Sequence, residues 1–583
     1  MHARLAFEAS GLASHGALRL DFGVPRAVLR ADTLSEVGPV IEAAQAAARQ
    51  GAWVVGWLAY EAASAFDPAL PTHAPDGPLA WFGVHDAPLA EEASGNGASD
   101  ARAAWVDTPG ARADFDAALA ALRQAIEAGE VYQVNHTARW HGELGHGSAL
   151  QWFERLRGEQ PAAYLAYVDG GGQQVLSLSP ELFFDWDGDE ILTRPMKGTA
   201  PRGVDARDDA AQAVRLKACA KERAENVMVV DLLRNDLSRI ARPGSVRVPS
   251  LFDMRALPTV WQMTSDVRAR TREGTPLLDV LRALFPCGSV TGAPKRQAMR
   301  RIVQHEADAR GVYCGAVGVL RPRGGATFNV AIRTVTVRGR ALSLGVGSGI
   351  TSGSQARAEW REWQHKKAFA ERAAESFELL ETLLLDWGTW RHEPRHRERM
   401  AQSAVCLGFA WREGDWGEAL RVLAAAHPQG LWRVRVLCAR DGRVQATAHA
   451  MDPAALPAPV RLVLAERAFA AAHSPFVRHK TTRRAHYAAA ERALPGVFDT
   501  LLWNDDGELT ECTRGNIALR FDEGWVTPAL DCGLLPGIGR QVALEEGRLR
   551  EAVVPLMALE RVREWAFLNS LRGWLPAVLE REV

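Results

Sequence analysis

The stretch KERAENVMVVDLLRNDLSRI at residues 221–240 decides how the first half of this chain is interpreted. It predicts a helix on which Glu222 and Glu225, three positions apart, face the same way. A second pair with this spacing, Glu359 and Glu362, lies further on in EWREWQHKK. Two such faces brought together would concentrate four hard oxygen donors, the ligands that Mg²⁺ prefers. Taken alone, each pair is more often a solvated helix face with surface ion pairs.

Length and composition indicate a globular protein with more than one domain. The chain has 583 residues, of which 47% are apolar and 24% charged. Its 69 Lys and Arg nearly cancel its 70 Asp and Glu, so overall charge gives no reason to expect binding to nucleic acid or an anionic membrane. No apolar run approaches the ~20 residues of a membrane helix. The start lacks a secretion signal and the seven cysteines lack paired spacings, so we expect a cytoplasmic protein with free thiols.

Separated groups of strands and helices predict an α+β protein with at least two domains. Strands are expected at AYLAYV (163–168), QVLSLS (174–179) and ELFFDW (181–186), and a surface loop at 91–104. Helices are expected at 115–129, 209–240, 354–377 and 395–409. We place the domain boundary near residue 375, which gives domains of 1–374 and 375–583.

A lysine in TRPMKGTAPR is a candidate nucleophile. Lys197 stands near Arg194, and a lysine becomes nucleophilic when burial or neighbouring cations lower its pKa. Gly198 would let the backbone approach a ligand closely. The alternative is an ordinary surface lysine in a turn. The loop CGSVTGAPKRQAM (287–299) leads into an expected helix whose free N–H groups can receive an anion, although its spacing is not that of a nucleotide P-loop.

These strings resemble the chorismate-utilising enzymes, in particular the aminodeoxychorismate synthase component I group. The matching strings, in order, are SPELFF, RPMKGT, KERAENVMVVDLLRNDLSRI, FPCGSVTGAPKRQAM, VYCGAVG, VAIRTV, GVGSGI and EWREWQHKK. The resemblance covers residues from about 50 to 370 and implies an α/β sandwich. The number and the order of these strings make a chance match negligible.

The resemblance implies a reaction and roles for named residues. Lys197 attacks C2 of chorismate and expels the 4-hydroxyl with allylic rearrangement, while Glu181 of SPELFF protonates the leaving oxygen. Ammonia then adds at C4 and expels Lys197, which gives 4-amino-4-deoxychorismate; anthranilate synthases typically have Ala at this position. The implied Mg²⁺ ligands are Glu225 and Glu362, with Glu222 and Glu359 completing the acidic site. The implied chorismate contacts are Tyr313, Arg333, Lys366, Thr291 and the backbone N–H groups of Gly347 and Gly349.

Three positions depart from the family pattern. Gln262 stands where the family commonly has a His that is linked to the fate of the enolpyruvyl group, so we do not expect this domain to release pyruvate. Cys287 replaces a common Gly, and Asn135-His136 differs from the usual sequence after YQV. None of these changes removes the nucleophile, the acid or the metal ligands.

A second set of candidate residues follows residue 375. Lys480 lies in HKTTRRAHY, Glu511 in TECTRGNIA and Arg399 in HRERMAQSA, and LLPGIGRQ is a Gly turn that enters a helix. Pyridoxal phosphate needs this set: a lysine for the Schiff base, an acid for the pyridine nitrogen, and cations and N–H groups for the phosphate. Individually, Lys480 could belong to a basic surface patch and Glu511 could be a surface acid.

Together these strings resemble the fold-type IV pyridoxal-phosphate enzymes over residues 377–575 or so, a family with two-subdomain chains. Its members include aminodeoxychorismate lyases, branched-chain aminotransferases and D-amino-acid aminotransferases. The resemblance implies Lys480 as the Schiff-base lysine, Glu511 as the pyridinium partner and Arg399 as a phosphate contact. Backbone N–H groups at Ile517, Ile538 and Gly539 would complete the phosphate site.

The fusion favours a bifunctional enzyme that makes 4-aminobenzoate for folate biosynthesis. A lyase would consume the product of the first domain and release pyruvate. No glutaminase domain is evident, so ammonia is expected from a glutamine amidotransferase partner; a homodimer through the second domain is implied, without nucleic-acid or membrane partners. One alternative is an anthranilate synthase component I-like enzyme fused to a branched-chain or D-amino-acid aminotransferase-like domain. The other is a binding or scaffold protein with degenerate sites.

Overall fold

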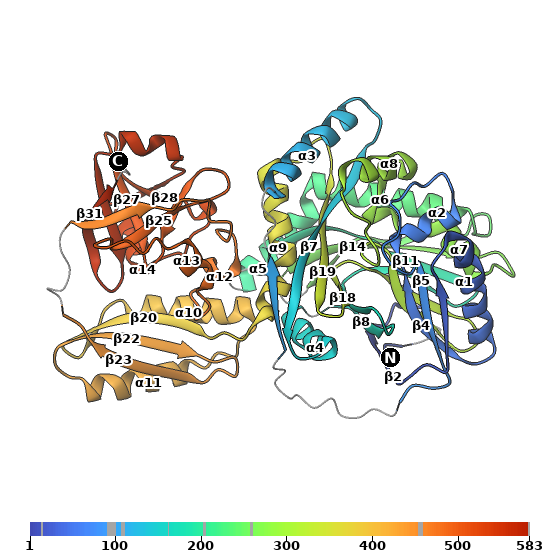
Figure 1. Ribbon diagram of the computed structural model, residues 1–583, viewed down its shortest axis with the longest axis horizontal. Coiled ribbons are helices and arrows are strands. Elements are labelled where there is room, and N and C mark those ends of the chain that lie inside the picture. Colours follow the sequence, from blue (N-terminus) through green and yellow to red (C-terminus); the bar gives the residue numbers. More distant parts are fainter. Residues whose placement is uncertain are drawn as a thin grey trace. The chain divides into compact units, whose positions relative to one another are not determined.

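The structure is a computed structural model that describes residues 1–12, 16–89, 101–106, 111–160, 162–201, 206–256, 260–452 and 459–580. It divides into two compact units, Met1–Glu375 and Ser376–Val583 (Figure 1). Both units mix helices and strands, which confirms the α+β prediction. Within the described ranges, no helix combines the length and apolarity needed to cross a membrane. All seven cysteines are free.

Two antiparallel sheets form the centre of the first unit. One sheet runs, among the described residues, in the order β15 (Gly292–Ala293), β7 (Gln133–His146), β19 (Ala341–Ile350), β18 (Thr334–Arg338), β9 (Gln174–Ser179), β8 (Tyr164–Asp169), β1 (Ala3–Phe7), β2 (Leu18–Phe22), with β6 (Arg102–Val106) beside β7. The other runs β12 (Met196–Pro201), β14 (Val260–Arg270), β11 (Glu190–Arg194), β10 (Leu182–Trp186), β17 (Ala326–Val330), β16 (Ala316–Leu320), β4 (Trp53–Leu58), β5 (Ala80–His85), β3 (Ala27–Ala31), with β13 (Arg247–Ala256) beside β14. A buried cluster joins Phe7 and Phe22 of the first sheet to Val55 and Trp57 of the second, so the sheets pack face to face.

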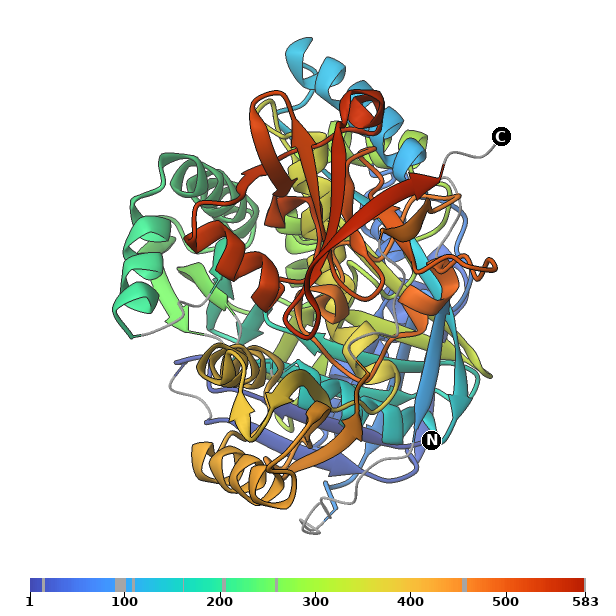
Figure 2. The ribbon, with the colours of Figure 1, turned by 90° about the vertical axis from the view of Figure 1, so that its left-hand side faces the viewer.

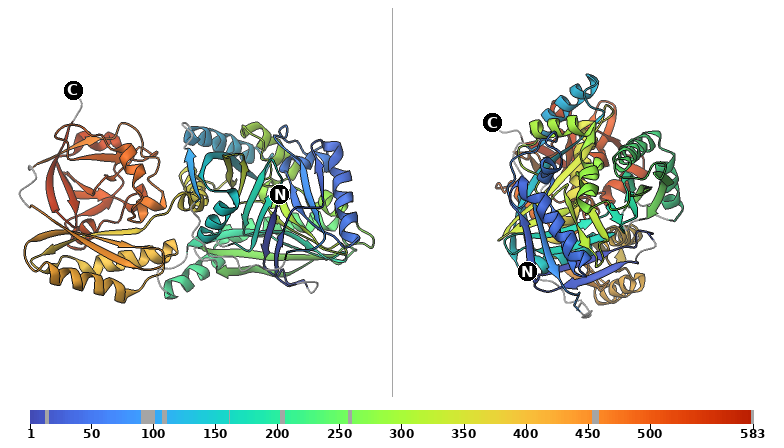
Figure 3. Two further views of the ribbon diagram at one scale, coloured as in Figure 1. Left: turned by 60° about the horizontal axis from the view of Figure 1, so that its bottom comes forward. Right: turned by 90° about the vertical axis from the view of Figure 1, so that its right-hand side faces the viewer.

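Helices cover both sheets, which explains why most of the central strands are buried on both faces. The helices on the first sheet are α3 (Ala111–Glu127), α4 (Ala149–Glu159), α9 (Ala356–Ala374) and α8 (Lys295–His305), which packs on β7. Those on the second are α1 (Leu34–Arg49), α5 (Ala206–Ala218) and α6 (Ala220–Ser238), with α7 (Leu277–Leu284) packed on α1 and α6. Figure 3 shows α1, in blue, along the outside of the blue strands.

Two predicted elements differ in the structure. The helix expected over 209–240 is two helices, α5 and α6, because Cys219 between them has an extended backbone (φ −65°, ψ 114°). The last part of the expected loop at 91–104 belongs to β6, and residues 91–100 lie outside the described residues. β6 is stabilised by tertiary packing, since the Trp105 ring stacks on that of Trp140 with centroids 4.3 Å apart.

The second unit has two subdomains, as predicted. A small sheet of β21 (Thr389–Trp390), β20 (Leu379–Asp386), β22 (Leu431–Cys438) and β23 (Val444–Ala450) packs against α10 (Glu393–Leu407) and α11 (Glu413–Ala426), drawn in gold and orange in Figure 2. A larger sheet contains β26 (Leu509–Cys512), β25 (Asp499–Trp503), β24 (Val460–Leu464), β31 (Gly573–Glu580), β30 (Glu564–Asn569), β27 (Asn516–Phe521), β28 (Gly524–Pro528) and β29 (Arg550–Ala552). The Leu380 N–H donates to the Lys480 carbonyl (2.9 Å), which ties the segment between the sheets to β20.

Candidate active sites

Glu181, directly before β10, is a buried carboxyl with an unusual protonation equilibrium. It is 3% exposed, and its Oε1 has no hydrogen-bond partner among the described residues. Burial raises the pKa of Glu181 to about 7, while hydrogen bonds from Ser289 and the Met196 N–H and the charge of Lys197 limit the rise. A carboxyl with this pKa is partly protonated at neutral pH and can act as a general acid.

Lys197 lies on β12, and its ammonium lies against the backbone of β19 at Gly349, which has no side chain. A Cβ placed on Gly349 would stand 2.9 Å from Lys197 Nζ, so a side chain there would collide with the lysine. Gly198 has φ +96°, a conformation that favours glycine, and a Cβ there would lie 3.3 Å from Glu222 Oε2. The structure therefore brings the lysine, the Gly349 backbone and the acidic face of α6 together.

Asn226 fixes the lysine strand and was not predicted from the sequence. Its Nδ2 donates to the Lys197 carbonyl (3.3 Å), and its Oδ1 accepts a hydrogen bond from Ser265 Oγ (2.7 Å). Asn226 follows Glu222 by one helical turn on the face of α6 that meets β12, so its position in KERAENV was the available signal.

Charges from α6 and α9 meet beside Lys197. Burial raises the pKa of Glu222, and the negative charges of Glu225 and Glu362 raise it further, while Lys221 and Lys197 oppose the rise. This mutual repulsion shows that three of the four predicted glutamates share one electrostatic environment. A cation placed among them would relieve the repulsion.

Three of the four predicted glutamates already have protein partners, and Glu225 Oε1 lies 3.9 Å from Lys221 Nζ. Glu359 is 7% exposed and accepts hydrogen bonds from the hydroxyls of Ser348 (2.6 Å) and Ser354 (2.7 Å). Glu362 pairs with Lys366 Nζ at 2.6 Å; burial acts to raise the pKa of Glu362, but Lys366 outweighs it and the pKa is lowered. In the described part of the chain, no three Asp, Glu, His or Cys side chains converge as a preformed metal cluster.

Lys366 and Gly347 are in direct contact. The Lys366 ammonium donates to the Gly347 carbonyl at 2.7 Å, and Gly347 lies in β19 against Thr137 and the carbonyl of His136 of β7. A Cβ on Gly347 would come within 2.5 Å of that carbonyl, so only glycine lets the strands approach this closely.

Arg333 and Tyr313, predicted to bind carboxylates, are placed by buried surroundings. Arg333 has φ +48° and donates to the side chain of Gln160; burial and, to a lesser extent, the nearby charge of Arg372 lower its pKa to about 10. The Tyr313 ring lies over Gly345, where a Cβ would be 2.1 Å from Cδ1. Burial raises the pKa of the Tyr313 phenol well above its ordinary value, so the hydroxyl remains a donor.

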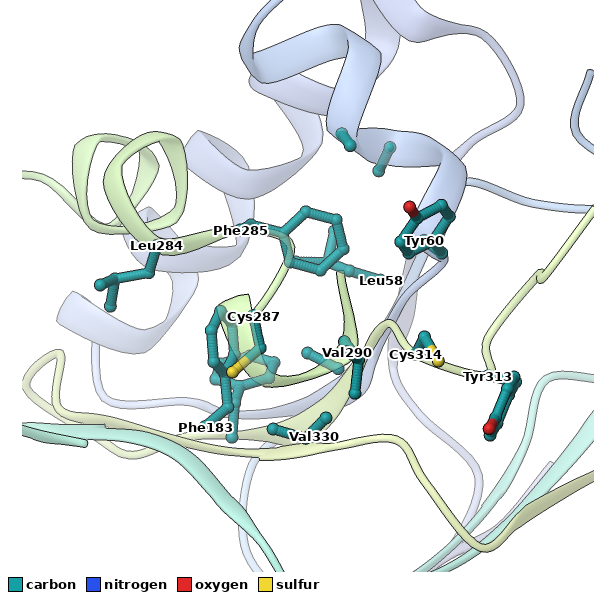
Figure 4. Close-up of a cluster of buried hydrophobic side chains, with 14 of the residues drawn as sticks. Leu58, Tyr60, Phe183, Leu284, Phe285, Cys287, Val290, Tyr313, Cys314 and Val330 are labelled. Atoms are coloured by element: carbon teal, nitrogen blue, oxygen red, sulfur yellow. The ribbon is translucent and has the colours of Figure 1, made fainter. Parts of the chain in front are cut away.

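Thr291 shapes its own loop. Its hydroxyl donates to the carbonyls of Cys287 (3.2 Å) and Gly288 (3.3 Å). Figure 4 shows Cys287 and Val290 of this loop beside Phe183 and Phe285, in a cluster of buried apolar side chains. The loop is therefore a rigid support for the region around Glu181.

The three positions that depart from the family pattern also lie at or near the region around Glu181 and Lys197. Gln262 of β14 is directly opposite Thr199 of β12, two positions from Lys197. Cys287 is buried, its Sγ is 3.2 Å from Ser289 Oγ, and burial raises its pKa to about 12, so it is a neutral thiol. His136 is also buried, and burial lowers its pKa to about 4.

A separate cavity of about 360 Å³ lies in the second unit, within the size range of small-molecule sites. Polar and charged residues lining it include Arg399, Lys480, Tyr487, Glu511, Asn516, Arg433, Arg484, Arg514, Thr513 and Arg572. Lys480, Glu511, Arg399 and Ile538, predicted from the sequence, all line this cavity. Ile517 and Gly539 do not belong to its lining; Ile517 lies in β27 and Gly539 in α14 (Ile538–Glu545).

Lys480 and Glu511 have protonation equilibria shifted toward their neutral forms. Burial, followed by the charges of Arg399 and Arg484, lowers the pKa of Lys480 to about 8. Burial raises the pKa of Glu511 to about 8, against the effect of a hydrogen bond that Tyr487 Oη donates to Glu511 Oε1 at 2.7 Å. Lysine reacts with carbonyl compounds as the neutral amine, and a depressed pKa increases the share of that form near neutral pH.

Arg399 is oriented by a buried carboxylate that was not predicted. Its Nε and Nη2 donate to the two oxygens of Glu381 at 2.7 Å each, and its Nη1 donates to the Pro536 carbonyl at 2.9 Å. His396 Nδ1 contacts the same carboxylate at 2.6 Å. Burial acts to raise the pKa of Glu381, but Arg399 and His396 outweigh it and lower the pKa to about 2. Glu381 thus fixes Arg399 and leaves two of its five N–H groups for a ligand.

Gly537, directly before α14, lets the backbone pack closely against Asn516 at the cavity wall. Asn516 Nδ2 donates to the Leu535 carbonyl (3.0 Å), and a Cβ on Gly537 would lie 1.9 Å from Asn516 Oδ1. Ile538 is the first residue of α14, where backbone N–H groups have no partner within the helix. Asn516 and Tyr487 were missed by sequence reasoning, although both lie inside the strings TECTRGNIA and HKTTRRAHY.

Comparisons with known proteins identify both units. Residues 13–372 match the family described as chorismate binding enzyme, and residues 378–579 match amino-transferase class IV. The chain is 41% identical over 241 residues to aminodeoxychorismate synthase component 1 of Escherichia coli, an alignment that covers 41% of this chain and 53% of that protein. It is 39% identical over 255 residues to anthranilate synthase component 1 of Streptomyces coelicolor, covering 44% and 50%. The chain thus spans about half the length of these relatives.

A solved structure agrees with this placement. Anthranilate synthase component I from Streptococcus pneumoniae matches with a TM-score of 0.50 and 25% identity, over 63% of this chain and 89% of that one. The match to the chorismate-binding family covers more than half of the 583 residues. By this measure the chain belongs to the chorismate binding enzyme family, and an amino-transferase class IV domain follows in the same chain.

Proposed function

We propose that this chain converts chorismate and ammonia to 4-amino-4-deoxychorismate in its first unit and that intermediate to 4-aminobenzoate and pyruvate in its second. The observation that supports it most is Lys197, whose ammonium lies against Gly349 while its charge acts on the buried acid Glu181. Similarity to aminodeoxychorismate synthase component 1 supports the same reaction. The 4-aminobenzoate would supply folate biosynthesis.

In the first unit, Lys197 Nζ would form a bond to C2 of chorismate. Both ring double bonds shift, the C4–O bond breaks, and Glu181 gives its proton to the departing oxygen, so water leaves. Ammonia then bonds to C4, both double bonds shift back and the bond from C2 to Lys197 breaks. Glu181 fits this role because its pKa of about 7 keeps it partly protonated at neutral pH. A covalent intermediate divides one difficult displacement into two easier steps.

Arg333, Tyr313 and the N–H groups of Gly347 and Gly349 would orient the substrate carboxylates, with Thr291 holding the adjacent loop. Glu225 and Glu362 would hold Mg²⁺, with Glu222 and Glu359 completing the acidic site. These four glutamates fit Mg²⁺, because carboxylates are hard oxygen ligands. The charges of Glu225 and Glu362 also raise the pKa of Glu222 by repulsion, which a bound cation would relieve. When bound, Mg²⁺ would neutralise a substrate carboxylate. Lys366, paired with Glu362 here, would then be released to contact that carboxylate.

In the second unit, the cavity residues fit pyridoxal phosphate. Lys480 would hold the cofactor covalently, Glu511 would face its pyridine nitrogen, and Arg399 with the N–H group of Ile538 would hold its phosphate. The N–H groups of Ile517 and Gly539, which directly follow the lining residues Asn516 and Ile538, would complete the phosphate site. The cofactor, when bound, supplies an electron sink for the carbon that bears the amine. Lys480 would take the C4 proton of the substrate; loss of the enolpyruvyl group as pyruvate then leaves an aromatic ring. Its pKa of about 8 suits a group that accepts and returns a proton near neutral pH.

Ammonia would come from a separate glutamine amidotransferase. Gln262, in place of the family His, is consistent with leaving pyruvate release to the second unit. The domain division at 1–374 and 375–583, a cytoplasmic location and a homodimer through the second unit belong to the same proposal.

The two half-reactions can be tested separately in the intact chain. Lys197→Ala should abolish formation of aminodeoxychorismate from chorismate and ammonium but leave conversion of added aminodeoxychorismate intact. Lys480→Ala should do the reverse. Loss of both half-reactions in either folded single variant would show that the sites do not work independently and would reject the proposal.

A further inference from the structure

The open end of the cavity in the second unit is lined with arginines that the proposed chemistry does not use. Arg433 comes from β22, Arg514 from the connection between β26 and β27, and Arg572 from the turn between β30 and β31. The three segments are far apart in the sequence, and the fold brings them to one cavity. Arg433 and Arg514 are exposed, whereas Lys480 and Glu511 are at the buried end.

The charges of these arginines are incompletely balanced. Arg514 pairs with Glu491 at 2.8 Å and also donates to the Phe498 carbonyl. Arg433 and Arg572 have no ion pair with any carboxylate of the described ranges. Partial burial lowers the pKa of Arg572, and the nearby charges of Arg433 and Arg514 lower it further. Three guanidinium groups therefore repel one another at a cavity wall whose lining includes only one carboxyl side chain, Glu511.

An arrangement of this kind favours an anionic ligand, because an anion would replace repulsion by charge-assisted hydrogen bonds. The cofactor phosphate is not that anion in our proposal, since it is assigned to Arg399, which is largely buried beside Glu381 and the Pro536 carbonyl, whereas Arg433 and Arg514 are exposed. Guanidinium groups bind carboxylates with paired, parallel N–H bonds.

We propose that Arg433, Arg514 and Arg572 bind a carboxylate that the substrate carries far from its amino group, and so select a cyclic amino dicarboxylate. This inference rests on the proposed function of the second unit. The amine-bearing carbon must meet Lys480 at the buried end, while the distal carboxylate reaches the open end. An amino acid with an apolar side chain has its only carboxylate on the amine-bearing carbon, beside Lys480, and offers none to Arg433, Arg514 and Arg572. The cavity should therefore discriminate against amino acids that carry no second carboxylate.

Steady-state kinetics of the pyridoxal-phosphate-loaded full chain with added aminodeoxychorismate tests this assignment. Arg433→Met and Arg572→Met should each raise KM about tenfold, and the double variant about a hundredfold, with kcat within about twofold. Arg435→Met, on the same strand but outside the cavity lining, is the matched control and should leave KM unchanged. The cofactor absorption spectrum should be the same in all variants, which separates substrate binding from loss of fold or cofactor.

Unchanged KM in the double variant, with the cofactor spectrum intact, would overturn the inference. If the wild-type holoprotein converts no aminodeoxychorismate, the proposed function fails, and calorimetry with benzene-1,4-dicarboxylate then decides the arginine assignment on its own. Binding to the wild type that is at least tenfold weaker in the double variant supports the assignment. Equal binding to both proteins, or none to the wild type, rejects it.

Discussion

The protonation of Glu181 gives the first unit a defined pH dependence. With a pKa of about 7, half of Glu181 is protonated at pH 7, whereas an exposed glutamate is protonated to less than about 1%. Because the protonated form donates to the departing oxygen, kcat for aminodeoxychorismate formation should be highest below pH 7 and fall as pH rises through it. Glu181→Gln should lower kcat by a factor of about 10² to 10⁴ and remove this descending limb.

Ser289 provides a graded test of the same group. Its hydrogen bond stabilises the charged carboxylate and holds the Glu181 pKa down. Ser289→Ala should raise that pKa and shift the descending limb to higher pH by about one unit. Ser245→Ala, on an exposed turn, is the control that should not shift it.

The assay should use the Lys480→Ala background, so that aminodeoxychorismate accumulates and can be measured by chromatography. The concentration of un-ionised ammonia must be held constant across the pH range, since it otherwise rises with pH. A wild-type profile that stays flat from pH 6 to 9, or a limb that Ser289→Ala leaves in place, would refute the role of Glu181 as the acid.

Three further predictions concern the second unit and the metal. Tyr487→Phe removes a hydrogen bond that holds down the Glu511 pKa, so the visible cofactor band should shift and lyase turnover should fall about tenfold; an unchanged spectrum would contradict this. Glu381→Gln leaves buried Arg399 without its carboxylate and should destabilise the second unit by about 3 kcal/mol in denaturant unfolding; a change below about 1 kcal/mol would contradict it. Removing Mg²⁺ with a chelator should abolish the first half-reaction but spare the lyase step, and equal loss of both would count against separate sites.

Local spacing was sufficient to predict the residues that come from one segment. Glu222 and Glu225 share a face because they are three positions apart on α6, and the residue order around Lys197 predicted a candidate nucleophile. The predicted helices α9 and α10 and strands β8 and β9 appear within a few residues of their expected ends, because their apolar periodicity agrees with their packing.

Features that depend on distant segments could not be predicted in this way. No local pattern indicates that Glu381 of β20 meets Arg399 of α10, or that Tyr487 donates to Glu511. The break at Cys219 was missed because no Gly or Pro separates α5 from α6, and the interruption consists only of the extended backbone of Cys219. The pKa values of Glu181 and Lys480 follow from burial, which only the folded chain determines.

In the proposed function, one chain carries chorismate to 4-aminobenzoate through two sites. Its most direct test is mass-spectrometric and NMR identification of the products formed from chorismate, ammonium and Mg²⁺ by the pyridoxal-phosphate-loaded chain. We expect 4-aminobenzoate and pyruvate in equal amounts, with aminodeoxychorismate accumulating when pyridoxal phosphate is omitted. Anthranilate without 4-aminobenzoate would contradict it.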